Sequence, residues 1–134
     1  MMAGAERVGE RRELPNLHDG KGTASAYGFF EGVIRPSMMF FNIVVKPGTY
    51  LGHHRHIGND EILYILSGMC ESFQDGLVSV VQAGVAILVK SGQSHAMRVI
   101  GDEDMEFLGF VAAPGEEIGT FENLPIPDAI ADWV

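Results

Sequence analysis

The sequence predicts an all-β protein built from many short strands, and three observations support this class. The 134 residues include 17 glycines, which divide the chain into short segments. Apolar residues occur in short runs between these glycines, with no sustained 3.6-residue spacing of the kind an amphipathic helix shows. The segment Gln74-Asp75-Gly76 separates two apolar runs, and Asp-Gly is a favoured hairpin turn. Short strands at regular spacing favour a sandwich or a barrel.

The chain divides into a polar beginning and a β-rich remainder. Residues 1–22 are predicted to form a polar N-terminal arm, in which His18 is a solvent-exposed residue. Residues 23–134 are predicted to form a single domain. This length can bury a core without disulfide support, and the sole cysteine, Cys70, is expected to be a small core residue.

The expected strands follow one another along the second segment. Residues 38–45 are apolar on both faces and should therefore be covered on both sides. The turn Lys46-Pro47-Gly48-Thr49 leads into the next strand. The C-terminal tail is expected to contain a short helical turn near residues 128–133. The predicted strands are 27–33, 38–45, 50–56, 61–66, 69–73, 77–81, 85–89, a strand that carries His95, and 105–111.

Composition excludes several classes of partner. The net charge is −9, and an acidic chain without a basic stripe is poorly suited to bind a nucleic-acid backbone or an anionic membrane surface. The beginning of the chain has no apolar targeting segment, and no apolar run is long enough to span a bilayer. The cytoplasm is therefore the default location. A small apolar barrel with excess hydrophobic surface is expected to form a homodimer, partly through residues 27–33.

Three histidines and one glutamate have the spacing of a metal site on β-strands. His54 and His56 are two residues apart, so on a strand both side chains point to the same face. Glu61 opens the next apolar run, and His95 follows a later one. Imidazoles and a carboxylate are ligands that Fe, Mn, Co, Ni, Cu and Zn accept. These four residues predict a site for one divalent transition metal ion. A loop cluster of histidines with no metal is the alternative.

The spacing resembles the two motifs of the cupin superfamily. Gly48, His54, His56, Glu61 and Gly68 fill every position of the first motif, and Gly84, Gly92 and His95 match the second. Lys90 and Val99 stand where the second motif has proline and asparagine. The two motifs cover residues 48–99. The resemblance implies a small jelly-roll-like cupin β-barrel with a metal held by three histidines and one glutamate.

Strand alternation predicts which residues surround the metal. If Glu61 points inward, Leu63 and Ile65 share its side, and Met97 shares the side of His95. Tyr50 shares the side of His54 unless a bulge intervenes. Phe40 and Phe107 are further candidates for the wall of a substrate pocket, and core packing is the alternative for each of these residues. The six pocket candidates are Tyr50, Leu63, Ile65, Met97, Phe40 and Phe107.

The resemblance implies several chemistries and does not choose among them. Cupins include dioxygenases, isomerases, cyclases and decarboxylases, as well as proteins that bind without catalysis, and a fold alone does not select one. We expect a metal-dependent enzyme that acts on a small organic substrate by Lewis-acid or oxygen-activating chemistry, with Glu61 as a catalytic residue that leaves the metal to act as a base. One alternative is a non-catalytic module that binds a small molecule or a metal. In another, the metal only stabilises the barrel.

Overall fold

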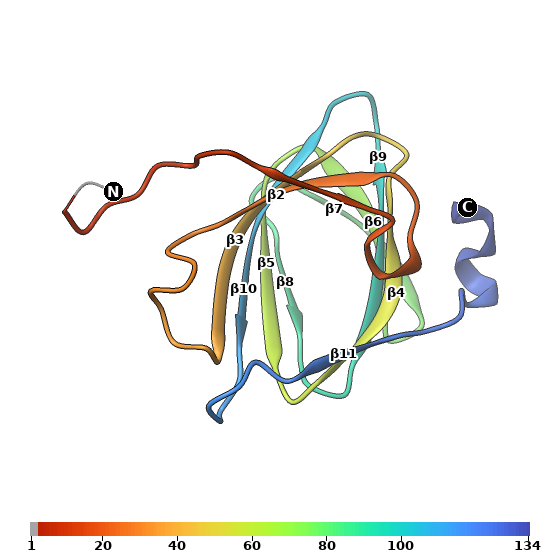
Figure 1. Cartoon of the computed structure of the whole chain (residues 1–134). Helices are drawn as coiled ribbons and strands as arrows, with labels where there is room; N and C mark the ends of the chain where they lie inside the picture. Colours follow the sequence, from red (N-terminus) through yellow and green to blue (C-terminus); the bar gives the residue numbers. More distant parts are fainter. Residues whose placement is uncertain (1–2) are drawn as a thin grey trace.

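The computed structural model describes residues 3–134, which form two antiparallel β-sheets packed face to face (Figure 1). The six-stranded sheet contains, in spatial order, β1 (Arg12–Pro15), β2 (Thr23–Gly28), β3 (Met38–Val45), β10 (Met105–Ala112), β5 (Asp60–Ser67) and β8 (Ala86–Val89). The five-stranded sheet contains β11 (Thr120–Asn123), β4 (Tyr50–Ile57), β9 (Ser94–Ile100), β6 (Met69–Gln74) and β7 (Leu77–Gln82). The all-β prediction is confirmed. Over the described residues no strand ladder joins the two sheets into a closed barrel. An isolated bridge joins Lys21, just before β2, to Tyr50 in β4.

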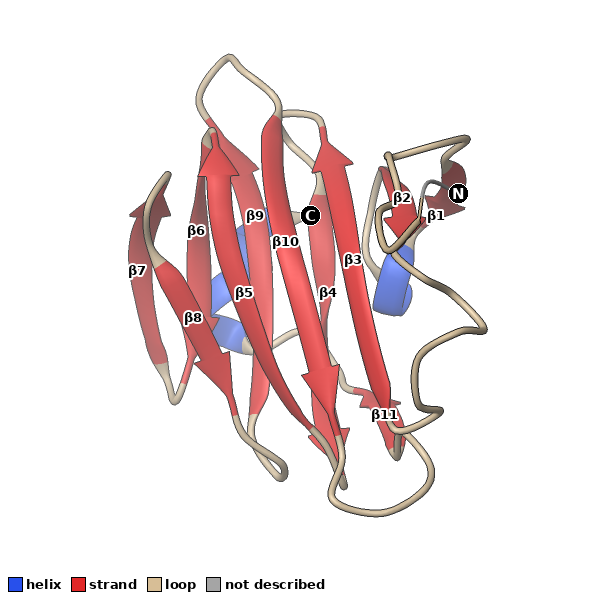
Figure 2. Cartoon of the chain, turned by 90° about the vertical axis from the view of Figure 1, so that its left-hand side faces the viewer, coloured by secondary structure: helices blue, strands red, loops and turns tan. Residues whose placement is uncertain are grey.

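Two short 3₁₀ helices complete the structure: η1 (Leu17–Asp19) and η2 (Asp128–Trp133). Figure 2 shows η1 beside β1 and β2 and η2 behind the long strands. η2 covers the outer side of the five-stranded sheet, where Ile130 and Trp133 pack with Tyr50, Phe73 and Ala96. The helical turn predicted near residues 128–133 is therefore confirmed.

The main core lies between the two sheets, because inward-facing residues alternate along each strand. In β5 the alternation is complete: Glu61, Leu63 and Ile65 are buried, whereas Ile62 and Tyr64 are exposed. The same core contains Cys70, which is fully buried as expected, and burial raises the pKa of its thiol to about 12. Thirteen further buried side chains belong to this core: Ala24, Ala26, Ile43, Val45, Leu51, Leu63, Ile65, Ile87, Val89, Met97, Val99, Met105 and Phe107.

The first predicted strand is wrong in position. β2 ends at Gly28, and residues 29–37 form turns, in which Phe30 has a left-handed backbone with φ 51°. β3 occupies the predicted residues, but it is not covered on both faces, since Met39 and Phe40 are 41% and 37% exposed. β1 and β11 were not predicted from the sequence. No helix among the described residues has the length and apolar character needed to cross a membrane.

The segment around η1 docks directly on β4. Lys21 and Tyr50 exchange two backbone hydrogen bonds of 2.8 and 2.9 Å. Gly52 is required at this contact, because a Cβ there would overlap the carbonyl oxygen of His18. The polar stretch before residue 23 thus reaches the strand that carries the paired histidines.

Candidate metal centre

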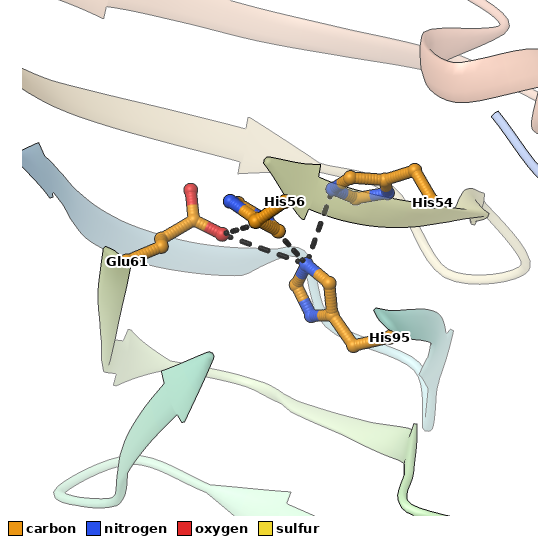
Figure 3. Close-up of side chains that lie close together, drawn as sticks. All are labelled: His54, His56, Glu61 and His95. Carbon is orange, nitrogen blue, oxygen red and sulfur yellow. Dashed lines mark hydrogen bonds and ion pairs between the residues drawn. The ribbon is translucent and has the colours of Figure 1, made fainter. Parts of the chain in front are cut away.

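The four predicted ligands converge on one point between the sheets (Figure 3). His54 and His56 come from β4, His95 from β9 and Glu61 from β5, so three strands of two sheets contribute. His54 and His95 are direct partners in the β4–β9 register. All four side chains are buried, and one donor atom from each lies within 4.8 Å of all the others.

The shortest distances join the atoms that would bind an ion. The Nε2 atom of His95 lies 3.2 Å from Nε2 of His54 and 3.3 Å from Nε2 of His56. Oε1 of Glu61 lies 3.3 Å from Nε2 of His56 and 3.5 Å from Nε2 of His95. Donors held about 2 Å from a common ion lie about 3 Å or slightly more apart. These spacings therefore fit four donors around one divalent metal.

Hydrogen bonds fix the tautomers of the two β4 histidines. Nδ1 of His54 lies 2.8 Å from the carbonyl oxygen of Gly52, and Nδ1 of His56 lies 2.8 Å from Oδ1 of Asn59. An oxygen of this kind only accepts, so both Nδ1 atoms carry the proton and both Nε2 lone pairs face the centre. Asn59 is itself anchored, because its Nδ2 donates to the carbonyl oxygen of Ile118 at 2.8 Å.

The electrostatic environment favours neutral imidazoles at two of the three positions. Burial lowers the pKa of His54 to about 3. Burial, together with repulsion from the neighbouring histidines, lowers the pKa of His95 well below its usual value. For His56 burial acts in the same direction, but the hydrogen bond and charge of Glu61 outweigh it and raise the pKa. A neutral imidazole is the form that binds a metal. The buried Nδ1 of His95 has no protein partner among the described residues.

A cavity of about 570 Å³ opens onto His54, Glu61 and His95, whereas His56 does not line it. Of the six pocket candidates, Phe40, Leu63, Met97 and Phe107 line it, whereas Tyr50 and Ile65 do not. Tyr50 is turned away because β4 has an extra residue relative to β9 between Leu51 and His54. Leu51, and not Tyr50, therefore shares the side of His54. Ile65 lies deeper, in the core between the sheets.

His18 was expected to be exposed, and the structure contradicts this. Its ring stacks on His54, with centroids 3.6 Å apart and planes 10° apart. Its Nδ1 lies 3.1 Å from Oδ1 of Asn123 in β11, and burial lowers its pKa. His18 has a left-handed backbone with φ 55°. Residues other than glycine keep this conformation only where the surrounding contacts impose it.

β11 supplies two further neighbours of the site that sequence reasoning missed. Phe121 pairs with His56 in the register and places its ring edge-on, with centroids 5.1 Å apart. Asn123 pairs with His54 and holds His18. The only local signal was the strand-favouring pair Thr120-Phe121 after Gly119, and nothing local indicated pairing with β4.

A β-sandwich with three buried histidines and one glutamate at its centre defines a class of protein with a candidate metal site. The family model described as "Cupin domain" matches residues 41–111, more than half of the chain. The protein belongs to the cupin family, as the motif spacing predicted.

Comparisons with individual proteins agree. The chain is 30% identical over 100 residues to the "Oxalate-binding protein" of Thermotoga maritima, which covers 73% of this chain and 83% of that protein. It is 24% identical over 78 residues to "Polyketide synthase CurC" of Streptomyces cyaneus, covering 57% of this chain and 51% of that protein.

A similar solved structure is the crystal structure of a predicted oxalate decarboxylase from Thermotoga maritima. Its TM-score is 0.73 with 27% identity, and the match covers 81% of this chain and 99% of that chain. KdgF from Halomonas sp. has a TM-score of 0.63 with 13% identity, covering 87% and 93% of the two chains. The second likeness concerns the fold alone.

The stack of His18 on His54 predicts an effect on metal affinity. His18→Ala removes the ring that restricts the orientation of His54, and we expect metal binding to weaken about tenfold, as is typical when a group that supports a ligand is lost. His18→Phe keeps an aromatic face and should restore most of the affinity. Competition with a chromophoric chelator measures this. Equal affinity of His18→Ala and the unaltered protein would contradict the role given to the stack.

Proposed function

We propose that this cupin binds one divalent transition metal through His54, His56, Glu61 and His95 and acts on a small organic molecule. The convergence of four buried donor atoms beside a cavity that three of the four residues line is the observation that carries the proposal. The bound metal would supply a Lewis acid or an oxygen-activating centre. A jelly-roll arrangement of the two facing sheets, which the family resemblance implies, would leave the cavity as the route to the metal.

The residues of the chain have separable tasks in this proposal. His54 and His56 present lone pairs whose direction is set by Gly52 and Asn59. Glu61 lies within 3.5 Å of two histidines and supplies the negative charge. As a base it would have to leave the metal, because a metal-bound carboxylate has lost most of its basicity. Apolar side chains such as Leu63, Met97 and Phe107 line the cavity beside these residues.

A non-catalytic binding module is the second candidate. The relative in Thermotoga maritima is named for binding oxalate, and the relatives together are named for both binding and synthesis. A binding module would use the same four residues and the same cavity, so the two candidates differ only in whether a bound molecule is converted.

Substitution of the ligands tests metal binding. His54→Ala and His95→Ala each remove a nitrogen donor and should abolish most of the binding, from about one ion per chain. Glu61→Gln keeps an oxygen but loses the charge, so it should weaken binding less. His53→Ala is the matched control, because the ring of His53 faces Ser94 and Pro125 instead of the cluster. Elemental analysis of the folded variants measures the stoichiometry. Full occupancy in both His54→Ala and His95→Ala would refute the proposal.

Removal of the metal separates a functional from a purely structural ion. The core between the sheets contains fourteen buried apolar residues, none of them a proposed ligand. We therefore expect the stripped protein to unfold cooperatively, with a melting temperature about 10 °C or less below that of the loaded protein, as for a ligand present at about a hundred times its dissociation constant. Calorimetry of both forms measures this. Loss of the cooperative transition on stripping would instead favour a metal that stabilises the fold.

We also propose that the chain forms a homodimer. η2 covers the outside of the five-stranded sheet, whereas the outside of the six-stranded sheet exposes Ile62, Tyr64, Leu66 and Leu88 at 42–52%. A contiguous apolar face of this kind is typical of an association surface. The adjoining rings of Phe40, Phe29 and Tyr27 extend this face into residues 27–33, the segment predicted to take part in the dimer.

Light scattering at tens of micromolar should give the mass of two chains. Tyr64→Glu places a charge on the exposed face and should shift the mass towards one chain, whereas Glu122→Ala on β11 should not. A monomeric mass for the unaltered protein would contradict the dimer.

A further inference from the structure

We propose that the cavity takes a molecule with two adjacent oxygen donors at one end and an apolar, ring-sized body at the other. This inference rests on the proposed function, because the oxygen donors need the metal at the four-residue cluster. It goes further by naming the class of ligand. It also distinguishes this protein from a relative named for binding oxalate, a molecule with no apolar part.

The size of the cavity is the first reason. Its volume of about 570 Å³ falls within the range of sites that enclose a ligand of drug-like size. It extends from His54, Glu61 and His95 at the inner end to the turns of residues 29–37 at the other. A molecule that occupied only the metal end would leave most of this space unused.

The chemistry of the wall is the second reason. Between the metal end and the opening, both sheets contribute apolar side chains. Binding of an apolar body against them is favourable, because it removes apolar surface from water. Six of them mark the length of the wall: Leu14, Ala26, Ile43, Leu51, Met97 and Phe107.

The position of the charges is the third reason. Apart from Glu61, the charged side chains that line the cavity among the described residues are Arg12, Glu31 and Arg35, and all three are exposed. Arg12 is also paired with Glu31 at 3.1 Å. Oxalate bound at the metal through two oxygens would turn its other two oxygens into a cavity lined mainly by apolar side chains, where a negative charge without a partner is costly. A neutral or singly charged head with an apolar body avoids that cost.

Two hydroxamates test the inference because they carry the same chelating head. Acetohydroxamate bears a methyl group and benzohydroxamate a phenyl ring, so their affinity ratio measures the contribution of the apolar body alone. We expect benzohydroxamate to bind metal-loaded protein at least about tenfold more tightly, and oxalate to bind more weakly than benzohydroxamate. Titration calorimetry with zinc-loaded protein gives all three constants.

The same ratio in metal-stripped protein separates this inference from the proposed function. Stripping should weaken both hydroxamates, but the advantage of the phenyl ring should persist, because the wall does not depend on the metal. If neither hydroxamate responds to the metal, the proposed function fails and the oxygen-donor half of the inference fails with it, whereas the ratio still tests the apolar body. Equal affinities for the two hydroxamates, or tighter binding of oxalate than of benzohydroxamate, would overturn the inference.

Two variants locate the body in the cavity. Ala26→Leu fills part of the wall and should cost benzohydroxamate about tenfold in affinity while changing acetohydroxamate less than about twofold. Met39→Gln makes the wall polar at a partly exposed position where folding is not at risk, and should reduce the ratio a few-fold. Val80→Ala, on an exposed strand outside the cavity, is the control. A ratio unchanged in both cavity variants would place the body elsewhere and refute the inference.

Discussion

The register of β4 against β9 is the constraint on which the candidate site depends. Leu51 pairs with Met97 and His54 pairs with His95, so β4 has one more residue than β9 over this interval. The extra residue brings Leu51 and His54 to the same side of the sheet. Without it, strict alternation would place Tyr50 on the side of His54. The bulge therefore joins a polar metal end to an apolar wall within one strand, and it moves Tyr50 to the outer face, beneath Trp133.

The same irregularity explains why an N-terminal segment reaches the site. Gly52 lies within the bulge, and the absence of a side chain there lets the backbone of η1 approach β4 closely. Two hydrogen bonds between Lys21 and Tyr50 hold the segment in place. His18, in this segment, stacks on His54. The left-handed backbone at His18 is maintained by these surrounding contacts.

Much of the fold could be predicted from local patterns, because most strands follow the alternation of apolar and polar residues. β5 shows this best, since Glu61 and Leu63 are buried and Ile62 and Tyr64 exposed, as parity required. The motif spacing predicted all four residues of the cluster. β1, β11 and η1 could not be predicted, since Arg12–Pro15 and Thr120–Asn123 are short and largely exposed segments, and distant partners determine their pairing. The strand expected at residues 27–33 failed because an apolar run can also form turns, as Phe30 shows.

The four candidate ligands are not part of the apolar core, and this affects which polar groups the protein can bury at the site. Three imidazoles and one carboxylate are buried together, which would be costly in a core that depended on them. Here the apolar residues between the sheets form one packed cluster and those under η2 form a second, and neither cluster includes any of the four. Folding can therefore proceed on burial of apolar surface, and the cluster can be arranged for an ion and its ligand. Several side chains of the core also line the cavity. A bound molecule would therefore contact the same apolar surface that stabilises the fold.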